Sequence, residues 1–284
     1  MATKHLLVDL SSHGFGHFAQ TSMVLNALHR LDLPIRVTLR STLPEKIIQE
    51  RLEMPVTIIH HTLDIGMVMH NAVDVDAKAS YDYYRSFHKE YEQAVKAEVE
   101  QLQALKPDLL FANVPYVSLS AASELNIPSI AMCSLNWAEI FAAFCQSFDG
   151  ADKFIGEIRQ AYSTAVHFLT VTPFMPMPEL HNTHPIPPIT HHGQNQTDTL
   201  RLMVEATVNK IPVVCIKRGN WPEEPALFDW VRQQGYLQTI QMNDLETGCF
   251  ANEVEQSLKT VWQKSPAQSN GAEVAASLIS EYLK

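Results

Sequence analysis

The apolar positions of the chain alternate between short continuous runs and helical repeats. Short segments that are apolar or rich in β-branched residues, bounded by polar or turn residues, predict strands at residues 6–8, 35–40, 56–60, 108–113, 128–133 and 167–171. Between these runs, apolar residues recur at steps of three and four, which is the period of an amphipathic helix. Strands therefore alternate with helices along the chain. Because parallel strands need crossover connections, this alternation predicts an α/β fold with a parallel sheet and helices on both faces.

The longest helical repeat covers residues 77–105 and predicts one long helix that ends before Pro107. Its first half carries an aromatic stripe from Tyr81 to Tyr91 at steps of three and four. Core packing explains such a stripe better than a platform for sugar binding, because one face of an amphipathic helix normally packs on the protein interior.

A change of composition marks a domain boundary. Six prolines lie between residues 173 and 188, a density that excludes regular structure and predicts a stiff extended linker. We therefore predict an N-terminal domain at residues 1–189 and a second domain at residues 190–284. In the second domain the pattern predicts helices at 199–210, 222–234, 251–263 and 271–283 and strands at 211–217 and 236–240.

The first strand leads into the sequence HGFGH at residues 13–17, and a helical repeat follows. Gly14 and Gly16 allow backbone dihedrals that are closed to other residues, and they place no Cβ in the way of a ligand. The start of the helix adds unpaired N–H groups and a positive dipole end, which suit an anionic group. His13 and His17 bracket the glycines, so a titratable base stands beside this anion-binding backbone.

The HGFGH turn resembles the first loop of GT-B glycosyltransferases. The resemblance is to the glycosyltransferase-like N-terminal domain of plant-type arabinokinases and their bacterial relatives, and more distantly to the lipid II N-acetylglucosaminyltransferase. Further stretches resemble these proteins in the same order at residues 64–76, 107–140, 174–180, 211–227 and 269–279. The resemblance implies a GT-B-like α/β architecture of two Rossmann-like domains, an acceptor-side domain followed by a donor-side domain.

The resemblance places His17 at the acceptor hydroxyl, as the base or orienting group of an inverting sugar transfer. A histidine that titrates near neutral pH suits the removal of a proton from the attacking oxygen. His13 would then be a hydrogen-bonding neighbour that fixes the turn. The other acceptor-side candidates are Gly14, Gly16, Asp64, Asn136 and Trp137. Asn136 and Trp137 follow a strand end, where open α/β sheets bind ligands, although a tryptophan there can equally cap the core.

The donor-side candidates lie around a second motif, KRGNWPEEP, which directly follows the predicted strand at 211–217. Arg218 can pair with a phosphate, and Glu223 and Glu224 can accept hydrogen bonds from sugar hydroxyls. Two acids in the first turn of a helix also complement its dipole, which needs no ligand. The resemblance gives Glu205 the place of a glutamate that holds the nucleotide ribose; its alternative role is that of an ordinary surface residue.

One part of the family pattern is missing between Ile189 and Thr199. In the relatives this interval holds the first strands of the second Rossmann domain and its own glycine-rich loop. A βαβ unit takes about 30 residues, so the chain that follows can build only two or three strand-helix units. The second domain is therefore predicted to be internally shortened, and its affinity for a nucleotide sugar to be weak or absent.

Composition limits the partners. The formal charge is −10, which argues against nucleic acid or an anionic membrane as the main partner. The first apolar run is too short for a signal peptide or a membrane span, and the four cysteines show no CxxC spacing, so we expect reduced thiols and a cytoplasmic location. The paired histidines lack a carboxylate or cysteine at ligand spacing, so no metal site is predicted.

Three functions are compatible with these features. The first is a metal-independent glycosyltransferase that needs no cofactor beyond a nucleotide-sugar co-substrate, with UDP among the candidate nucleotides, and an unidentified acceptor. The second is a non-catalytic GT-B descendant that acts as a binding or interaction protein. The third is a phosphate-ester or sugar-phosphate enzyme that uses the same turn. A shortened second domain would also leave apolar surface that a second subunit could cover in a homo-oligomer.

Overall fold

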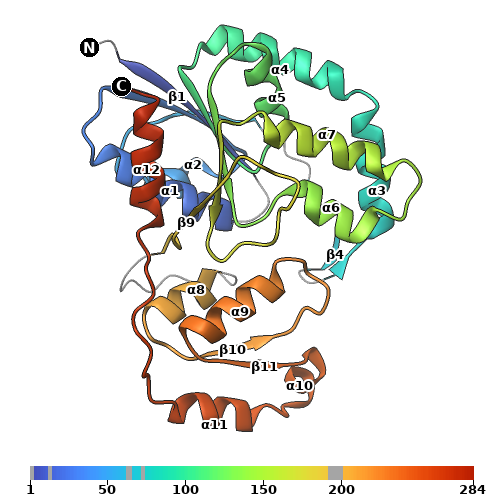
Figure 1. The fold of residues 1–284 in the computed structure, drawn as a ribbon, viewed down its shortest axis with the longest axis vertical. Helices are drawn as coiled ribbons and strands as arrows, with labels where there is room; N and C mark the ends of the chain where they lie inside the picture. The colour runs from blue at the N-terminus through green and yellow to red at the C-terminus, as the bar shows by residue number, and fades with distance from the viewer. Residues whose placement is uncertain (1–2, 12–14, 62–65, 72–73, 191–200) are drawn as a thin grey trace.

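The computed structural model describes residues 3–284 apart from 12–14, 62–65, 72–73 and 191–200 (Figure 1). Its main body contains a seven-stranded sheet in the order β3-β2-β1-β6-β7-β8-β9, and every neighbouring pair is parallel. The strands are β1 Lys4–Leu10, β2 Ile35–Arg40, β3 Thr57–Ile59, β6 Leu109–Asn113, β7 Ser129–Cys133, β8 His167–Val171 and β9 Thr183–Ile186. The predicted α/β fold with a parallel sheet is confirmed.

Helices cover both faces of this sheet (Figure 1). On one face lie α3 Ala77–His88, α4 Tyr91–Leu105, α5 Val117–Glu124, α6 Trp137–Cys145 and α7 Ala151–Ser163, which share one apolar core. On the other face lie α1 Phe15–His29, α2 Glu45–Arg51 and α12 Gly271–Glu281, which share a second core. A short antiparallel pair, β4 Met69–Asn71 and β5 Asp74–Val75, precedes α3.

The long helix expected at 77–105 is wrong, because the chain forms α3 and α4 with a break at residues 89–90. His88 anchors the end of α3: its Nδ1 lies 2.7 Å from Glu157 Oε2 and its Nε2 lies 3.0 Å from the Tyr116 hydroxyl. The interpretation of the aromatic stripe as core packing is confirmed, since Tyr81 and Tyr84 are both buried.

The proline-rich stretch contains regular structure, so the expectation that it forms only a stiff extended linker is wrong. It contains β9, which pairs with β8 in parallel register, with Pro185 opposite Thr170. A proline cannot donate to a strand ladder and is therefore confined to sheet edges. In this sheet β9 is the edge strand, so the missing N–H of Pro185 costs no ladder bond on its open side.

A smaller body follows, built on the parallel strands β10 Val213–Ile216 and β11 Leu237–Ile240. Its helices are α8 Arg201–Val208, α9 Glu224–Gln234, α10 Met242–Thr247 and α11 Ala251–Lys259. In Figure 1, α8 and α9 lie on the side of this small sheet that faces the main body. Residues of α8, α9 and β10, such as Met203, Phe228 and Val213, form its own apolar core.

The chain returns to the main body at its end. Helix α12 packs along α1, and its Ala275 and Ile279 are buried in the same core as β1 (Figure 1). The division of the chain at residues 189 and 190 stays a prediction. The packing shows that α12 lies on the large sheet and not on the small one.

Gly271 lies close to Pro187, where the C-terminal segment that returns to the main body passes the segment that leaves it. A Cβ at this position would lie 2.0 Å from the Pro187 carbonyl oxygen, which is backbone and cannot rotate away. We expect Gly271→Ala to lower the free energy of unfolding by about 2 kcal/mol or more, because the backbone must shift. Urea denaturation measures the loss.

Gly156 is the matched control, since it lies inside α7 and a Cβ there would meet nothing within 4 Å. Gly156→Ala is expected to stabilise the protein by about 0.5–1 kcal/mol through helix propensity. Equal effects of the two substitutions would show that the close approach at Gly271 is not a constraint.

Candidate active site

His17 lies at the carboxyl edge of the large sheet, in the first turn of α1. Its side chain is half-buried, and its Nδ1 lies 3.1 Å from Oδ1 of Asn113, the last residue of β6. The two elements meet because β1 and β6 are neighbouring parallel strands, so their carboxyl ends lie side by side. The histidine of the glycine turn is therefore held by a second strand end.

The hydrogen bonds of Asn113 determine which nitrogen of His17 carries the proton. Asn113 Nδ2 donates to the His17 carbonyl oxygen at 3.2 Å and to Thr21 Oγ1 at 3.0 Å. A carbonyl oxygen can only accept, so this side of the amide must be the NH₂ group and the other side must be Oδ1. His17 Nδ1–H then donates to Oδ1, and the neutral ring carries its lone pair on Nε2. This is the tautomer of a base that acts through Nε2.

Cys133 lies near the same ring nitrogen, with its Sγ 3.7 Å from His17 Nδ1. It is the last residue of β7 and is fully buried. Burial raises the pKa of the Cys133 thiol to about 12, so the sulfur stays protonated at neutral pH. Cys133 therefore packs against the histidine as a neutral group and does not act as a nucleophile.

The loop that follows β10 in the small body reaches this edge of the large sheet. Glu223 lies beside the side chain of Ser134, the residue after Cys133. Burial raises the pKa of Glu223, and the neighbouring Ser134 and Trp221 side chains and the charge of Arg218 oppose this rise. The carboxyl edges of the two sheets thus face each other, with Glu223 in between.

Trp221 joins the loop to the main body. Its ring lies 6.2 Å from that of Phe144 on α6, between ring centres, and it packs against the core of that face. The Arg218 guanidinium lies 5.5 Å from the centre of the Trp221 ring, which is the range of a cation–π contact. Arg218 is therefore held in place by a residue that itself contacts the opposite body.

Glu224 has a local role as well. Its Oε2 accepts a hydrogen bond from the Arg218 backbone N–H at 2.7 Å, and it occupies the first turn of α9. Both the bond and the helix dipole favour a carboxylate at this position. Glu223 and Glu224 thus have different partners, one in the other body and one in their own loop.

The remaining candidates are placed as follows. Gly16 lies inside α1 with open space around its Cβ position and without a positive φ, so a special dihedral does not explain this glycine. Asn136 caps α6 by accepting from the Glu139 N–H at 2.8 Å, and Trp137 is 3% exposed in the core of that face. Glu205 is half-buried on α8. His13, Gly14 and Asp64 lie outside the described residues.

The predicted site residues do not include Asn113, Cys133, Ser134 or Trp221. Asn113 and Cys133 end buried strands, and Ser134 follows one, so their place at the sheet edge could be predicted from the strand pattern. Nothing in the sequence indicates that Asn113 bonds to His17. Trp221 lies within the second motif, between two of the predicted donor-side residues.

The described part of the chain contains no group of three or more His, Cys, Asp or Glu side chains arranged to hold a metal ion. Among the described helices, none is long and apolar enough to cross a membrane.

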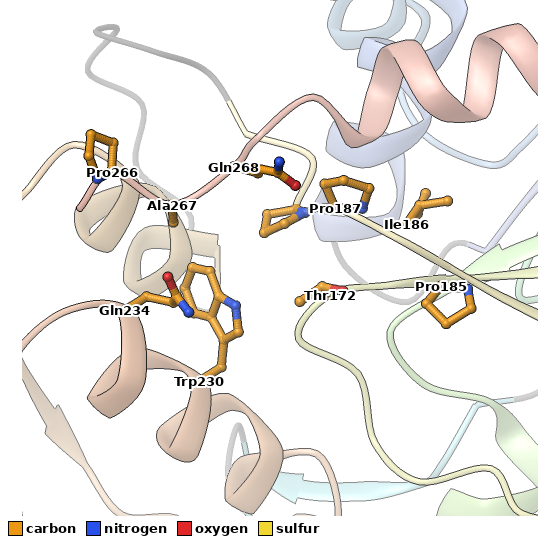
Figure 2. A pocket seen from close by; sticks show the side chains of 10 residues that line it. Thr172, Pro185, Ile186, Pro187, Trp230, Gln234, Pro266, Ala267 and Gln268 are labelled. Carbon is orange, nitrogen blue, oxygen red and sulfur yellow. The ribbon is translucent and has the colours of Figure 1, made fainter. Parts of the chain in front are cut away.

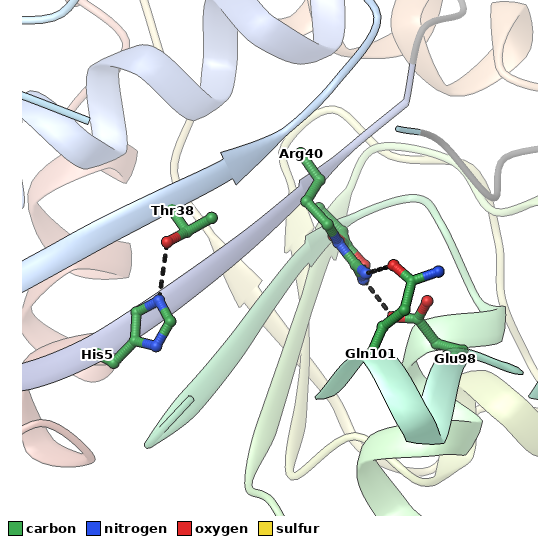
Figure 3. Close-up of polar contacts among 6 residues, drawn as sticks. His5, Thr38, Arg40, Glu98 and Gln101 are labelled. Atoms are coloured by element: carbon green, nitrogen blue, oxygen red, sulfur yellow. Dashed lines mark hydrogen bonds and ion pairs between the residues drawn. The ribbon is translucent and has the colours of Figure 1, made fainter. Parts of the chain in front are cut away.

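A buried charge cluster lies further along the same sheet edge, at the ends of β1 and β2. Arg40 binds both carboxylate oxygens of Asp9 and also contacts Glu98 and Gln101 on α4 (Figure 3). Arg40, Asp9 and Glu98 are all less than 5% exposed. Burial raises the pKa of Glu98 to about 7, although the charge of Arg40 lowers it.

The raised pKa of Glu98 predicts a pH dependence of stability. Between its ordinary pKa of 4.5 and about 7, folded Glu98 keeps a proton that the unfolded chain releases. Stability should therefore fall as the pH rises through this window. We expect Glu98→Gln to reduce that fall, measured as the free energy of unfolding in urea at pH 5 and pH 7.5. Glu50→Gln, at an exposed position on α2, is the control and should keep the wild-type slope.

Comparison with known proteins identifies the fold. No family model matches the chain. The crystal structure of CalG4, the calicheamicin glycosyltransferase, matches at a TM-score of 0.60 and 12% identity, over 100% of this chain and 99% of that one. The chain has a GT-B fold. A second GT-B structure, MurG of Acinetobacter baumannii, matches at a TM-score of 0.50 and 12% identity over 98% of this chain and 99% of that one.

One curated sequence relative supports the same GT-B resemblance. L-arabinokinase of Arabidopsis thaliana is 24% identical over 243 residues, which are 83% of this chain. The match spans only 23% of that protein, so most of the relative has no counterpart in this chain. The GT-B fold accounts for the meeting of two sheet edges at His17.

Proposed function

We propose that the protein is a glycosyltransferase that moves a sugar from a nucleotide-sugar donor to an acceptor hydroxyl, without a metal ion. The observation that supports this proposal is the meeting of the two sheet edges. His17 lies on the edge of the large sheet, with its Nδ1 3.7 Å from Cys133 Sγ. Arg218 belongs to the loop of the small body whose Glu223 lies beside Ser134, the residue after Cys133. A base and a cation that face one cleft are the two groups that this transfer needs.

In the proposed reaction the acceptor oxygen attacks the anomeric carbon of the donor sugar. Its proton passes to Nε2 of His17, whose tautomer is set by Asn113. The bond from the anomeric carbon to the phosphate oxygen breaks, and the nucleoside diphosphate leaves with the electron pair. Arg218 and the N-terminal end of α1 offset the negative charge that develops on this leaving group.

The donor would lie against the small body, with Arg218 at its phosphates and Glu205 and Glu224 as candidate partners of the ribose and the sugar. Glu224 already bonds to the Arg218 backbone, so it would hold the loop as well as the sugar. The described part of the small body offers two strands, β10 and β11, and no glycine-rich turn. Since such turns carry much of a diphosphate's charge in similar folds, we expect weak donor affinity.

Ligand-observed NMR tests donor binding even when it is weak. Saturation-transfer spectra would be recorded with UDP, GDP, ADP, TDP and a sugar conjugate of each. We expect signal from one nucleotide and its sugar, with at least about tenfold weaker binding to Arg218→Ala, because a charged hydrogen-bond partner of phosphate is lost. Arg232→Ala, at an exposed position on α9, is the matched control and should bind as the wild type does.

Absence of signal from every nucleotide would contradict the proposal and would leave a non-catalytic binding protein as the better interpretation. Equal binding by the Arg218→Ala and Arg232→Ala variants would show that the donor lies elsewhere.

A further inference from the structure

A cavity lies between the two bodies, beside the chain segments that connect them. It has a volume of about 490 Å³ and lies between the carboxyl ends of β8 and β9 and the second half of α9 (Figure 2). Thr172 and Ile186 line it from the large sheet, and Trp230 and Gln234 line it from α9. This volume lies within the ordinary range for small-molecule sites.

Both passages of the chain between the two bodies form walls of this cavity. Residues 187–188 belong to the outgoing passage and residues 266–268 to the returning one. The two passages are tied together just beyond the cavity, where the Gly271 N–H donates to the Pro188 carbonyl at 3.1 Å. We call this cavity the hinge pocket, because it touches both bodies and both of their connections.

The chemistry of the lining selects an uncharged ligand. None of the described residues that line the hinge pocket has an ionisable side chain. Trp230 offers a flat aromatic face with the Gln234 amide beside it, and the Gln268 amide lies across the pocket near Pro187, so both amides offer donors and acceptors, as Figure 2 shows. Thr172 adds a hydroxyl group. A nucleoside diphosphate would leave its charge without a partner here, so the pocket is not a second donor site.

We propose that the hinge pocket binds an uncharged saccharide. A sugar ring has an apolar C–H face that packs on an indole and a rim of hydroxyls that bond to amide and hydroxyl groups, which are the groups present in the pocket. The prolines of both passages add rigid apolar walls. Rigid walls lower the entropy lost on binding, which favours a small ligand with few contacts.

Helix α9 connects the hinge pocket to the cleft at His17. Glu223 stands at its N-terminal end beside Ser134, whereas Trp230 and Gln234 lie in its second half. Trp230 follows Glu223 by seven residues, a rise of about 10 Å along the helix, so the two side chains contact different parts of the region between the bodies. A bound saccharide contacts both bodies and therefore stabilises the arrangement in which Glu223 reaches Ser134. The inference concerns a site beyond the proposed transfer site and does not depend on transfer activity.

Tryptophan fluorescence of the whole chain tests the proposal. The probes are D-glucose, D-galactose, L-arabinose, N-acetyl-D-glucosamine and maltose, each titrated to about 20 mM. We expect a saturable change with at least one sugar, because a ring stacked on Trp230 alters its surroundings. Trp230→Phe should lose this change, and Trp262→Phe, a substitution elsewhere in the small body, should keep it. Calorimetry supplies the affinities independently of fluorescence.

Two substitutions localise the binding. Ala267→Phe fills the pocket from the returning passage and should weaken binding at least about tenfold, provided that its thermal unfolding shows a folded protein. Gln268→Ala, at an exposed position that does not threaten the fold, should weaken binding about fivefold through the loss of one hydrogen bond. His17→Ala and Arg218→Ala should bind the sugar as the wild type does.

Absence of binding by every sugar would overturn the proposal. Binding that Gln268→Ala and Trp230→Phe leave unchanged would also overturn it, because the sugar would then lie outside the hinge pocket. Loss of sugar binding in His17→Ala or Arg218→Ala would place the sugar in the transfer cleft instead. These outcomes are independent of the nucleotide titrations, so failure of one proposal is distinguishable from failure of the other.

Discussion

Replacing His17 by alanine is expected to lower the rate of sugar transfer at least about 100-fold. The loss follows from the role of Nε2 as the acceptor of the hydroxyl proton, because general-base catalysis typically contributes a factor of about 10² to 10⁴. The side chain is half-buried at the sheet edge and contributes little to the core, so thermal unfolding should change by only a few degrees. Donor binding by NMR should persist, because the proposed donor side chains Arg218, Glu205 and Glu224 lie on the other body and the substitution leaves the α1 backbone in place.

The control for this substitution lies on the same helix. His29 is exposed in the last turn of α1, and His29→Ala should leave the rate unchanged. A transfer rate of His17→Ala within threefold of the wild type would show that another group removes the proton.

Replacing Arg40 by methionine is expected to lower the free energy of unfolding by about 3 to 5 kcal/mol. Methionine keeps much of the volume but leaves Asp9 and Glu98 buried without their cation. Breaking a buried ion pair from one side leaves an uncompensated charge, which accounts for a loss of this size. Denaturation in urea at pH 7.5 measures the loss.

Lys46→Met is the control, because Lys46 is 85% exposed and its contact with Glu50 spans 3.8 Å. Exposed ion pairs contribute at most about 1 kcal/mol, so little change is expected. A loss below 1 kcal/mol for Arg40→Met would show that the Arg40 charge does not stabilise Asp9 and Glu98 in the folded protein.

The sequence predicts the central architecture because local signals and tertiary packing agree there. In a segment such as 108–113, apolar side chains point to both faces of the strand. Such a strand is stable only when both faces are covered, so these segments identify the strands of the parallel sheet. The strand-turn-helix pattern likewise places His17 at the carboxyl edge. Figure 1 shows the resulting layers of helix, sheet and helix.

Elements that depend on distant neighbours could not be predicted in this way. Prolines argue against a strand at 183–186, and only the open edge beside β8 makes one acceptable. The terminal helix has an apolar face that would suit either body. Its place on α1 follows from the close passage of Gly271 against Pro187, which has no signature in the sequence.

The sequence also predicts only part of the candidate site. The motifs that contain His17, Arg218, Glu223 and Glu224 stand out as polar and glycine-containing stretches after strands. Their partners do not, because a buried asparagine such as Asn113 has the same sequence signature as one that only caps a turn. The tautomer of His17 depends on three hydrogen bonds of that one amide, and these require coordinates.

The most direct test of the account is the release of a nucleoside diphosphate from a nucleotide sugar, followed by mass spectrometry in the presence of a mixture of sugar and lipid acceptors. The account predicts that the wild-type chain releases the diphosphate of the nucleotide identified by NMR and forms one new glycoside. It also predicts that both His17→Ala and Arg218→Ala fail to do so. No turnover of any nucleotide sugar by the wild-type chain, or equal turnover by His17→Ala, would contradict the account.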